Sequence, residues 1–408
     1  MKTILHCDAN NFYASVECYL NPSLRGKFVA VSGNPEKRHG IILAKNQAAK
    51  KCGVKTGETI WQAKQKCPDL VCVPPHFDTY VDFSNRIFDI YSQYTDRVQP
   101  FGIDECWLDV TGSKRLFGDG RTIADTLRER IKREIGVTIS VGVSFTKIFA
   151  KLGSDMKKPD ATTVITPENF RDLVWKLDCA DLLMIGRRTA EKLHKIGIFT
   201  IGDLANTDVE ILRRLLGVNG VKLHESANGI EDDEVRYSYE KYVPKSVGNS
   251  TTLPADVSTR EQLCAVVFAL CEMVATRMRK HGFVGEGIGI GLRFNDLSHI
   301  GKQSAMPPTD SAMQLCDCAM SLVDKIYTFG KDLPVRAVSV GVFDLLTQGS
   351  ERQTSIFDSE EMHGHSLGTA LDKIRSRYGY NSILSASVLQ NAVICDGLED
   401  SDFQPFKK

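Results

Sequence analysis

The chain contains 408 residues, of which 42% are hydrophobic and 25% are charged, and its 51 Lys and Arg are balanced by 51 Asp and Glu. This length is too great for a single core, and no apolar run approaches the ~20 residues that span a bilayer, so we expect several modules and no membrane segment. The N-terminus is polar too soon for a signal peptide, and the twelve cysteines are scattered without a C-x-x-C pair, which indicates reduced thiols in a cytoplasmic protein.

The first part of the chain alternates between apolar runs and helical patterns. Residues 3–7 are typical of a short buried strand, and apolar residues recur with helical spacing over residues 12–20. Two further apolar stretches lead to a helix predicted over residues 44–52, which ends at a glycine. Between residues 19 and 77, ten Lys or Arg stand against three Asp or Glu. This basic segment fits a polyanion-binding surface and, equally, an ordinary solvated surface.

A second set of elements predicts a sheet with helices packed on it. Apolar residues recur at helical spacing over residues 79–95, and a hairpin is predicted from two β-like runs at residues 97–102 and 106–110. A helix over residues 122–135 and a strand over residues 137–143 follow. Strands that alternate with helices in this way indicate an α/β domain.

The remainder of the chain divides into three further segments. Residues 166–232 have an all-helical pattern punctuated by glycines, and the charged, unpatterned stretch from 232 to 245 is predicted to be a linker. The next unit has the order of a two-layer βαββαβ module, with predicted strands at 245–253, 286–306 and 334–344 and helices at 259–281 and 308–328. From residue 350 we expect a polar tail with one helical patch near residues 367–378.

Three carboxylates are expected at one edge of the first sheet. Asp8 follows the first strand, and Asp104 and Glu105 occupy the tip of the predicted hairpin. Together they could hold two Mg²⁺ ions, which prefer oxygen ligands. Adjacent strand residues point to opposite faces, so Asp104 and Glu105 can share a site only at a turn or bulge. On spacing alone the simpler interpretation is structural, with Asp8 capping the first helix and Asp104 stabilising the turn.

Three motifs give this sequence its resemblance to a known family. They read DANNFYASVE at residues 8–17, IDECWLD at residues 103–109, and SFTKIFAK at residues 144–151 with a Lys-Pro pair at 158–159. In this order and at these distances they resemble the signatures of Y-family translesion DNA polymerases. The resemblance extends to about residue 349. It favours the catalytic interpretation of the three carboxylates over the structural one.

The resemblance implies a metal-dependent polymerase site. Asp8 and Asp104 would bridge two Mg²⁺ ions, with the carbonyl group of Ala9 as a backbone ligand. Glu105 would hold the ion that lowers the pKa of the primer 3′-hydroxyl. Catalysis would then depend on electrostatics and in-line positioning, without a covalent intermediate.

The same resemblance implies a nucleotide site beside the metals. Tyr13, next to Phe12, would be the steric gate that excludes a ribose 2′-hydroxyl, although core packing would also explain an aromatic residue there. Lys158 would neutralise the triphosphate. Gln47 and Lys50 stand where much of the family has tyrosine and arginine. Lysine lacks the bidentate fork of arginine, and this pattern is more similar to the polymerase V catalytic subunit than to polymerase IV.

The implied fold is a right-hand polymerase of mixed α/β and α+β class, with a ferredoxin-like palm, small fingers, a helical thumb and a βαββαβ little finger. The implied boundaries are palm 1–18 and 78–165, fingers 19–77, thumb 166–232, linker 233–243, little finger 244–349 and tail 350–408.

Two short segments are similar to known docking motifs. Ile185, Gly186 and Arg187 lie in a stretch that resembles a helix-hairpin-helix turn, whose backbone N–H groups contact a DNA phosphate. A plain αα-hairpin is an equally good interpretation of that turn, and Met184 occupies a place where the family has glycine. In the tail, Gln353, Ile356 and Phe357 resemble the peptide by which bacterial polymerases bind the sliding β clamp.

These expectations combine into one functional hypothesis and its rivals. We expect a monomeric enzyme that extends a primer–template with dNTPs opposite damaged bases, at low fidelity, with two Mg²⁺ ions and a β clamp as partner. The first rival is a polymerase V-type subunit that needs accessory proteins. The second is a catalytically silent scaffold that binds DNA and the clamp, which would not need three carboxylates. A palm-like nucleotide cyclase would not need the modules that follow residue 165.

Overall fold

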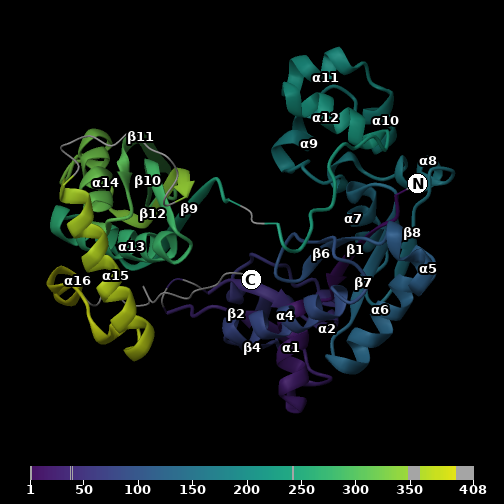
Figure 1. Ribbon diagram of the computed structural model, residues 1–408, viewed down its shortest axis with the longest axis horizontal. Coiled ribbons are helices and arrows are strands. Elements are labelled where there is room, and N and C mark those ends of the chain that lie inside the picture. The colour runs from purple at the N-terminus through teal and green to yellow at the C-terminus, as the bar shows by residue number, and fades with distance from the viewer. Residues whose placement is uncertain (1, 37, 39, 241–242, 348–358, 392–408) are drawn as a thin grey trace. The chain divides into compact units, whose positions relative to one another are not determined.

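The computed structural model describes residues 2–36, 38, 40–240, 243–347 and 359–391 (Figure 1). The chain divides into two compact units, one formed mainly by residues 1–33 and 41–240 and the other mainly by residues 241–402. Gln353, Ile356 and Phe357 lie outside the described residues, so the clamp motif has no structural description. No helix in the described ranges is long and apolar enough to cross a membrane.

The first unit contains a five-stranded sheet in the order β5-β6-β1-β7-β8. Its strands are β1 (Ile4–Ala9), β5 (Val98–Pro100), β6 (Glu105–Asp109), β7 (Ile139–Ser144) and β8 (Thr162–Val164). β1 lies at the centre, antiparallel to both β6 and β7, and all six of its residues are buried. The predicted strands and hairpin are confirmed, with ends that shift by one or two residues.

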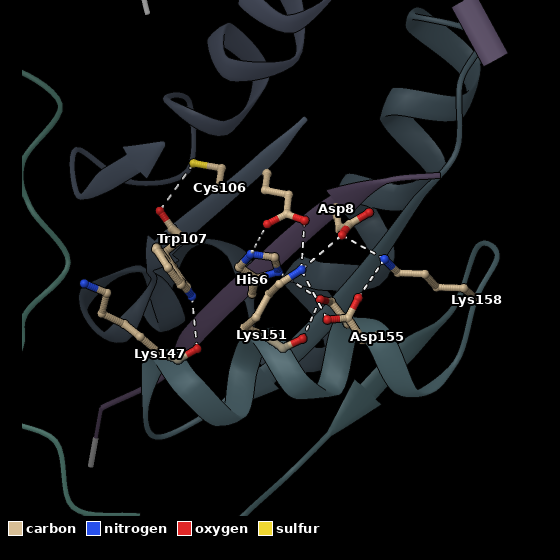
Figure 2. A network of polar contacts seen from close by, with 10 residues as sticks. His6, Asp8, Cys106, Trp107, Lys147, Lys151, Asp155 and Lys158 are labelled. Atoms are coloured by element: carbon tan, nitrogen blue, oxygen red, sulfur yellow. Dashed lines mark hydrogen bonds and ion pairs between the residues drawn. The ribbon is translucent and has the colours of Figure 1, made fainter. Parts of the chain in front are cut away.

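Side chains of β1 alternate between the two faces of this sheet. Leu5 and Cys7 share a core with the helices α4 (Phe77–Tyr91) and α6 (Gly120–Glu134). Ile4, Trp107 and Ala150 form a separate cluster on the face covered by α7 (Lys147–Met156). His6 and Asp8 follow Ile4 at intervals of two residues, so their side chains point to the same face of the sheet. Figure 2 shows them on the side of α7. The α7 face is therefore the one that carries polar chemistry.

One glycine lets α7 approach the sheet closely. A Cβ atom added to Gly142 on β7 would lie 1.9 Å from the carbonyl oxygen of Ala150 and 2.6 Å from the backbone nitrogen of Ser154. Any other residue at this position would push the helix away. Because α7 supplies polar side chains to the site, this contact sets their distance from β1.

A small three-stranded sheet in the order β3-β2-β4 follows α1 (Phe12–Leu20). Its elements are β2 (Val29–Ser32), β3 (Ile42–Lys45), α2 (Gln47–Lys51), α3 (Ile60–Lys66) and β4 (Val71–Val73). The helix predicted over residues 44–52 begins later than expected, because Ala44 and Lys45 pair with β2. The side chain of Asn46 then caps α2 by accepting a hydrogen bond from the backbone of Ala49 at 3.0 Å.

Residues 166–232 are helical, as predicted. The helices are α8 (Phe170–Val174), α9 (Arg187–His194), α10 (Ile201–Asn206), α11 (Val209–Leu216) and α12 (Val218–Ala227), with the short 3₁₀ helix η3 (Cys179–Asp181) before α9. The first residues of the predicted linker, which follows these helices, pack against the first unit. Val235 is buried in the cluster with Ile4 and Trp107, and Asp233 pairs with the buried ammonium group of Lys147.

The second unit has the predicted βαββαβ order. Its elements are β9 (Ser246–Val257), α13 (Arg260–Lys280), β10 (Phe283–Phe294), β11 (His299–Thr309), α14 (Ala312–Ile326) and β12 (Val335–Thr347). The strand order is β11-β10-β12-β9, and neighbouring strands are antiparallel.

The expected polar tail is wrong for part of the chain beyond residue 350. The helical patch is present within α15 (Ser359–Tyr378), but this helix packs on α13. Arg375 forms a buried ion pair with Glu272 at 3.0 Å, and Asp372 pairs with Arg279 at 2.6 Å. Val388 on α16 (Ala386–Gln390) joins the core of the unit. These contacts join residues about a hundred positions apart, which local sequence patterns do not reveal.

Candidate active site

Three carboxylates meet at one edge of the five-stranded sheet. Asp8 on β1 and Glu105 on β6 are direct partners in the antiparallel register, so their side chains share a face. Asp104 lies in the bend before β6, where its carbonyl oxygen accepts a hydrogen bond from the backbone of Ala9 at 2.9 Å. Because Asp104 is outside the pleated strand, the alternation of side chains does not separate it from Asp8.

A cavity of about 320 Å³ opens beside these carboxylates. It joins the end of β1, the start of α1 and the strand β3, and both acidic and basic groups face it. Its lining residues are Asp8, Ala9, Asn11, Phe12, Tyr13, Leu43, Ala44, Lys45, Thr56, Asp104 and Lys158. Glu105 does not line this cavity and lies beside Asp8.

Two lysines compensate the charge of the carboxylates, as Figure 2 shows. The Nζ atom of Lys151 lies 2.8 Å from Oε1 of Glu105 and 3.4 Å from Oδ2 of Asp8. Lys158 places its Nζ atom 2.8 Å from the same Asp8 oxygen. Asp155 contacts both ammonium groups, at 3.2 Å from Lys151 and 2.8 Å from Lys158. Lys151 and Asp155 lie four residues apart on one side of α7, and Lys158 reaches Asp155 from the segment that follows the helix.

Burial makes ionisation of the carboxylates costly. It raises the pKa of Asp8 to about 7, although Lys158 and Lys151 oppose the shift. Burial and the charge of Glu105 together raise the pKa of Asp104 to about 6. Burial acts on Glu105 as well, but the neighbouring His6 ring and the charge of Lys151 hold the pKa of Glu105 below its usual range. Such a group of carboxylates favours the approach of a cation.

His6 supports the site from beneath. Its ring is fully buried, with Nδ1 2.9 Å from the hydroxyl group of Ser154 and Nε2 3.7 Å from Oε2 of Glu105. The ring also contacts Trp107 edge-on, at a centroid distance of 5.3 Å. The His6 ring therefore packs beneath Glu105 and is held to α7 through Ser154.

The sequence predictions missed His6, Lys151 and Asp155 as site residues. The signals were present in local spacing. His6 precedes Asp8 by two positions on a strand, which places both on the same face. Asp155 lies four residues after Lys151, at helical spacing.

Tyr13 both packs and lines the cavity. Its ring is half-buried, stacks on Tyr80 at 4.3 Å with an interplanar angle of 14°, and meets the edge of Phe77. The hydroxyl group of Tyr80 donates a hydrogen bond to the buried carboxylate of Glu17 at 2.5 Å, which fixes Tyr80 in place. Phe12, the residue before Tyr13, is almost fully buried. The two interpretations of Tyr13, gate and core residue, are therefore compatible.

The basic groups near the cavity differ from the prediction in one respect. Lys50 is exposed on α2 and is absent from the lining, whereas Lys45 on β3 lines the cavity and donates a hydrogen bond to Thr56 at 2.8 Å. Burial and the nearby charge of Lys50 lower the pKa of Lys45. Lys50 therefore lies outside the lining of this cavity.

The predicted helix-hairpin-helix turn lies before α9. Ile185 is buried, Gly186 occupies the N-cap position and Arg187 is the exposed first residue of the helix. No side chain caps α9, so its first N–H groups are available to an anion. Met184 has a φ of 75° and is 79% exposed, which is a left-handed conformation that glycine adopts at lower cost.

Comparisons with known proteins give consistent matches. Residues 7–155 match the impB/mucB/samB family, and residues 244–356 match the C-terminal domain of that family. The chain is 46% identical to DNA polymerase IV of Acetivibrio thermocellus, over 96% of this chain and 98% of that protein. It is 35% identical to DNA polymerase IV 1 of Bacillus subtilis, over 95% and 94%. A solved Y-family DNA polymerase chimera, Dbh-Dpo4(243-245)-Dbh, has a TM-score of 0.75 and 25% identity, and the match covers 85% of this chain and 100% of that chain.

Proposed function

This chain belongs to the impB/mucB/samB family of Y-family translesion DNA polymerases, and we propose that it extends primers with dNTPs by a two-metal-ion mechanism at the cavity beside Asp8. The observation that carries the proposal is the convergence of Asp8, Asp104 and Glu105 at one sheet edge, next to a cavity that also contains Tyr13 and Lys158. Low fidelity and bypass of damaged template bases complete the proposal.

The modules take their roles from this assignment. The palm comprises residues 1–18 and 78–165, the fingers residues 19–77, the thumb residues 166–232 and the little finger residues 244–349. The five-stranded sheet of the palm carries the chemistry, and the other modules would hold the primer–template through its backbone.

The residues at the sheet edge fit divalent cations. The carboxylates of Asp8 and Asp104 and the carbonyl group of Ala9 offer hard oxygen ligands at the cavity, and Glu105 lies beside Asp8. Burial raises the pKa of Asp8 and of Asp104, which means that their ionised forms lack sufficient counter-charge. When bound, two Mg²⁺ ions would lower the pKa of the primer 3′-hydroxyl and neutralise charge on the triphosphate.

The other side chains orient the substrate. Lys158 contacts Asp8 at 2.8 Å, and an incoming triphosphate would offer its ammonium group a stronger anionic partner, which releases Asp8 to bind a cation. Asp155 keeps both lysines at the site during this exchange. Tyr13, held against Tyr80, would exclude a ribose 2′-hydroxyl by occupying its space.

Among the alternatives, polymerase IV-like activity has the better support. The relatives reported above are named DNA polymerase IV, whereas the polymerase V-like interpretation depends on Gln47 and Lys50 alone. Gly186, Ile185 and Arg187 would bind DNA phosphate through the turn before α9. Gln353, Ile356 and Phe357 would bind a β clamp, and we propose that the chain acts as a monomer.

Primer extension by the purified chain tests this function. With Mg²⁺ and dNTPs we expect templated extension on an intact template and insertion opposite an abasic site, and both should stop when a chelator removes the metal. No extension on either template would support the catalytically silent scaffold. Extension that requires added accessory proteins would support the polymerase V-type alternative.

A further inference from the structure

A second cluster of possible metal ligands lies in the thumb, outside the cavity. It consists of Asp178, the adjacent Cys179 on η3 and His194 at the end of α9 (labelled in Figure 1). Their ligand atoms all lie within 4.8 Å of one another. The Sγ atom of Cys179 is 3.6 Å from Nε2 of His194, and that nitrogen is 3.8 Å from Oδ1 of Asp178.

These separations approach those of a tetrahedral zinc site. Zn–S and Zn–N bonds of about 2.3 and 2.0–2.1 Å, at a tetrahedral angle, place the two ligand atoms about 3.6 Å apart. The observed distance between Cys179 and His194 is 3.6 Å. An oxygen ligand requires a separation of about 3.3 Å from the nitrogen, so Asp178 needs to move by about half an ångström, and its side chain is 55% exposed.

The surrounding contacts hold the ligands in place. The His194 ring stacks on Phe199 at 5.2 Å with an interplanar angle of 28°, and the backbone N–H of Cys179 donates to the carbonyl oxygen of Phe199 at 2.8 Å. Asp178 is tied by a backbone bridge to Thr200, and its Oδ1 accepts a hydrogen bond from Ala180 at 2.8 Å. The ligand atoms are therefore gathered by a network that does not depend on an ion.

We propose that Asp178, Cys179 and His194 bind a transition-metal cation of the Zn²⁺ class, with water as the fourth ligand. A thiolate combined with an imidazole selects such ions over Mg²⁺, which prefers oxygen. The partial exposure of His194 and Asp178 leaves room for the water.

The position of the site gives it a structural consequence. Residues 178 and 179 precede the turn at Met184 to Arg187, and His194 ends the helix that follows it. A bound ion would tie both sides of this turn together and restrict its motion. The site is separate from the Mg²⁺ chemistry of the palm, so a failure to bind metal here would not overturn the proposed polymerase function.

Cobalt binding tests the proposal, because tetrahedral Co²⁺–thiolate complexes absorb in the near ultraviolet and visible ranges. The full chain, stripped of metal with a chelator, should bind one Co²⁺ with such a spectrum, and Zn²⁺ should displace it. Cys179→Ser should abolish the thiolate band, and His194→Gln should weaken binding at least about tenfold. Cys318→Ser is the control, since Cys318 is a free thiol on α14, outside this cluster, and it should leave binding unchanged.

Several results would overturn the proposal. The first is the absence of stoichiometric Co²⁺ or Zn²⁺ binding by the wild-type chain, and the second is a thiolate band that persists in Cys179→Ser or disappears in Cys318→Ser. If Cys179→Ser does not fold, His194→Gln and Asp178→Asn decide the matter, because both side chains are at the surface. Unchanged affinity in these two variants would also exclude the site.

Discussion

The two units of this chain bury charged side chains in different ways. In the palm, Asp8, Asp104 and Glu105 gather charge of one sign beside a cavity, and Lys151 and Lys158 each contact more than one partner. In the second unit, Glu272 on α13 and Arg375 on α15 form a buried pair at 3.0 Å.

We infer that the charged groups in the palm serve the reaction, whereas the charged pair in the second unit stabilises the fold. Carboxylates that share lysine partners can exchange those partners when substrate and metal bind. Holding several charges of one sign together lowers the stability of the fold. A buried pair of opposite charges cannot exchange, and breaking it leaves one charge uncompensated. Substitutions in the first group should change activity, and substitutions in the second should change stability.

The largest effect is expected at the carboxylates. Asp104→Asn keeps the size of the side chain but weakens its ability to hold a cation, so the rate of single-nucleotide insertion should fall at least about a hundredfold. DNA affinity and thermal stability should stay near those of the wild-type chain, because the proposed role of the Asp104 carboxylate is to hold metal and not duplex. Rapid-quench insertion and fluorescence anisotropy measure the two quantities. An active Asp104→Asn variant would refute the metal assignment.

The buried ion pair should show the opposite behaviour. Glu272→Met leaves the Arg375 guanidinium uncompensated, and we expect a loss of about 3–5 kcal/mol in the free energy of unfolding of the second unit. The rate of nucleotide insertion at a temperature where the variant is folded should not change. The double variant Glu272→Met with Arg375→Met is the control and should recover part of the loss. Equal stability of Glu272→Met and wild type in urea unfolding would remove the contrast between the units.

Tyr13 lies in the palm, so its substitution should change activity. Removing the ring in Tyr13→Ala should lower the preference for dCTP over CTP, expressed as the ratio of kcat/KM, by at least about tenfold. Tyr13→Phe keeps the ring and should keep the preference. If Tyr13→Ala retains the wild-type ratio, the tyrosine is only a packing residue against Tyr80.

The smallest effect is expected at the strained turn in the thumb. Met184 adopts a φ of 75°, which costs a non-glycine residue about 1–2 kcal/mol, and glycine relieves this strain at some cost in chain entropy. Met184→Gly should therefore stabilise the thumb by about 0.5–1 kcal/mol, measured as a rise in Tm, whereas Met184→Ala should give no gain. A lower Tm in Met184→Gly would show that the methionine side chain contributes more than the strain removes.

Local patterns predicted the elements well where the deciding interactions are local. The helix Phe12–Leu20 has the predicted bounds, and the βαββαβ order of the second unit is as expected. The late start of α2 was readable in Asn46, a favoured N-cap residue, but the pairing of Ala44 in β3 with Val31 in β2 required the fold.

The site divides in the same way. The spacing of Asp8 and Asp104 did not by itself distinguish capping from metal binding, and the family motifs favoured metal binding. Lys151 on α7 contacts Asp8 and Glu105, which lie far from it in the sequence, and the pair Glu272–Arg375 joins residues 103 positions apart. Such long-range pairings leave little periodic signal in a single sequence.

Counting bound metal in the ternary complex tests the central claim most directly. The wild-type chain is combined with a dideoxy-terminated primer–template, a matching dNTP and Mn²⁺ as a paramagnetic substitute for Mg²⁺, and bound Mn²⁺ is measured by electron paramagnetic resonance. We predict two Mn²⁺ per complex for the wild type and fewer for Asp104→Asn, at equal DNA occupancy. Two Mn²⁺ in both complexes would contradict the assignment of the carboxylates as the metal ligands.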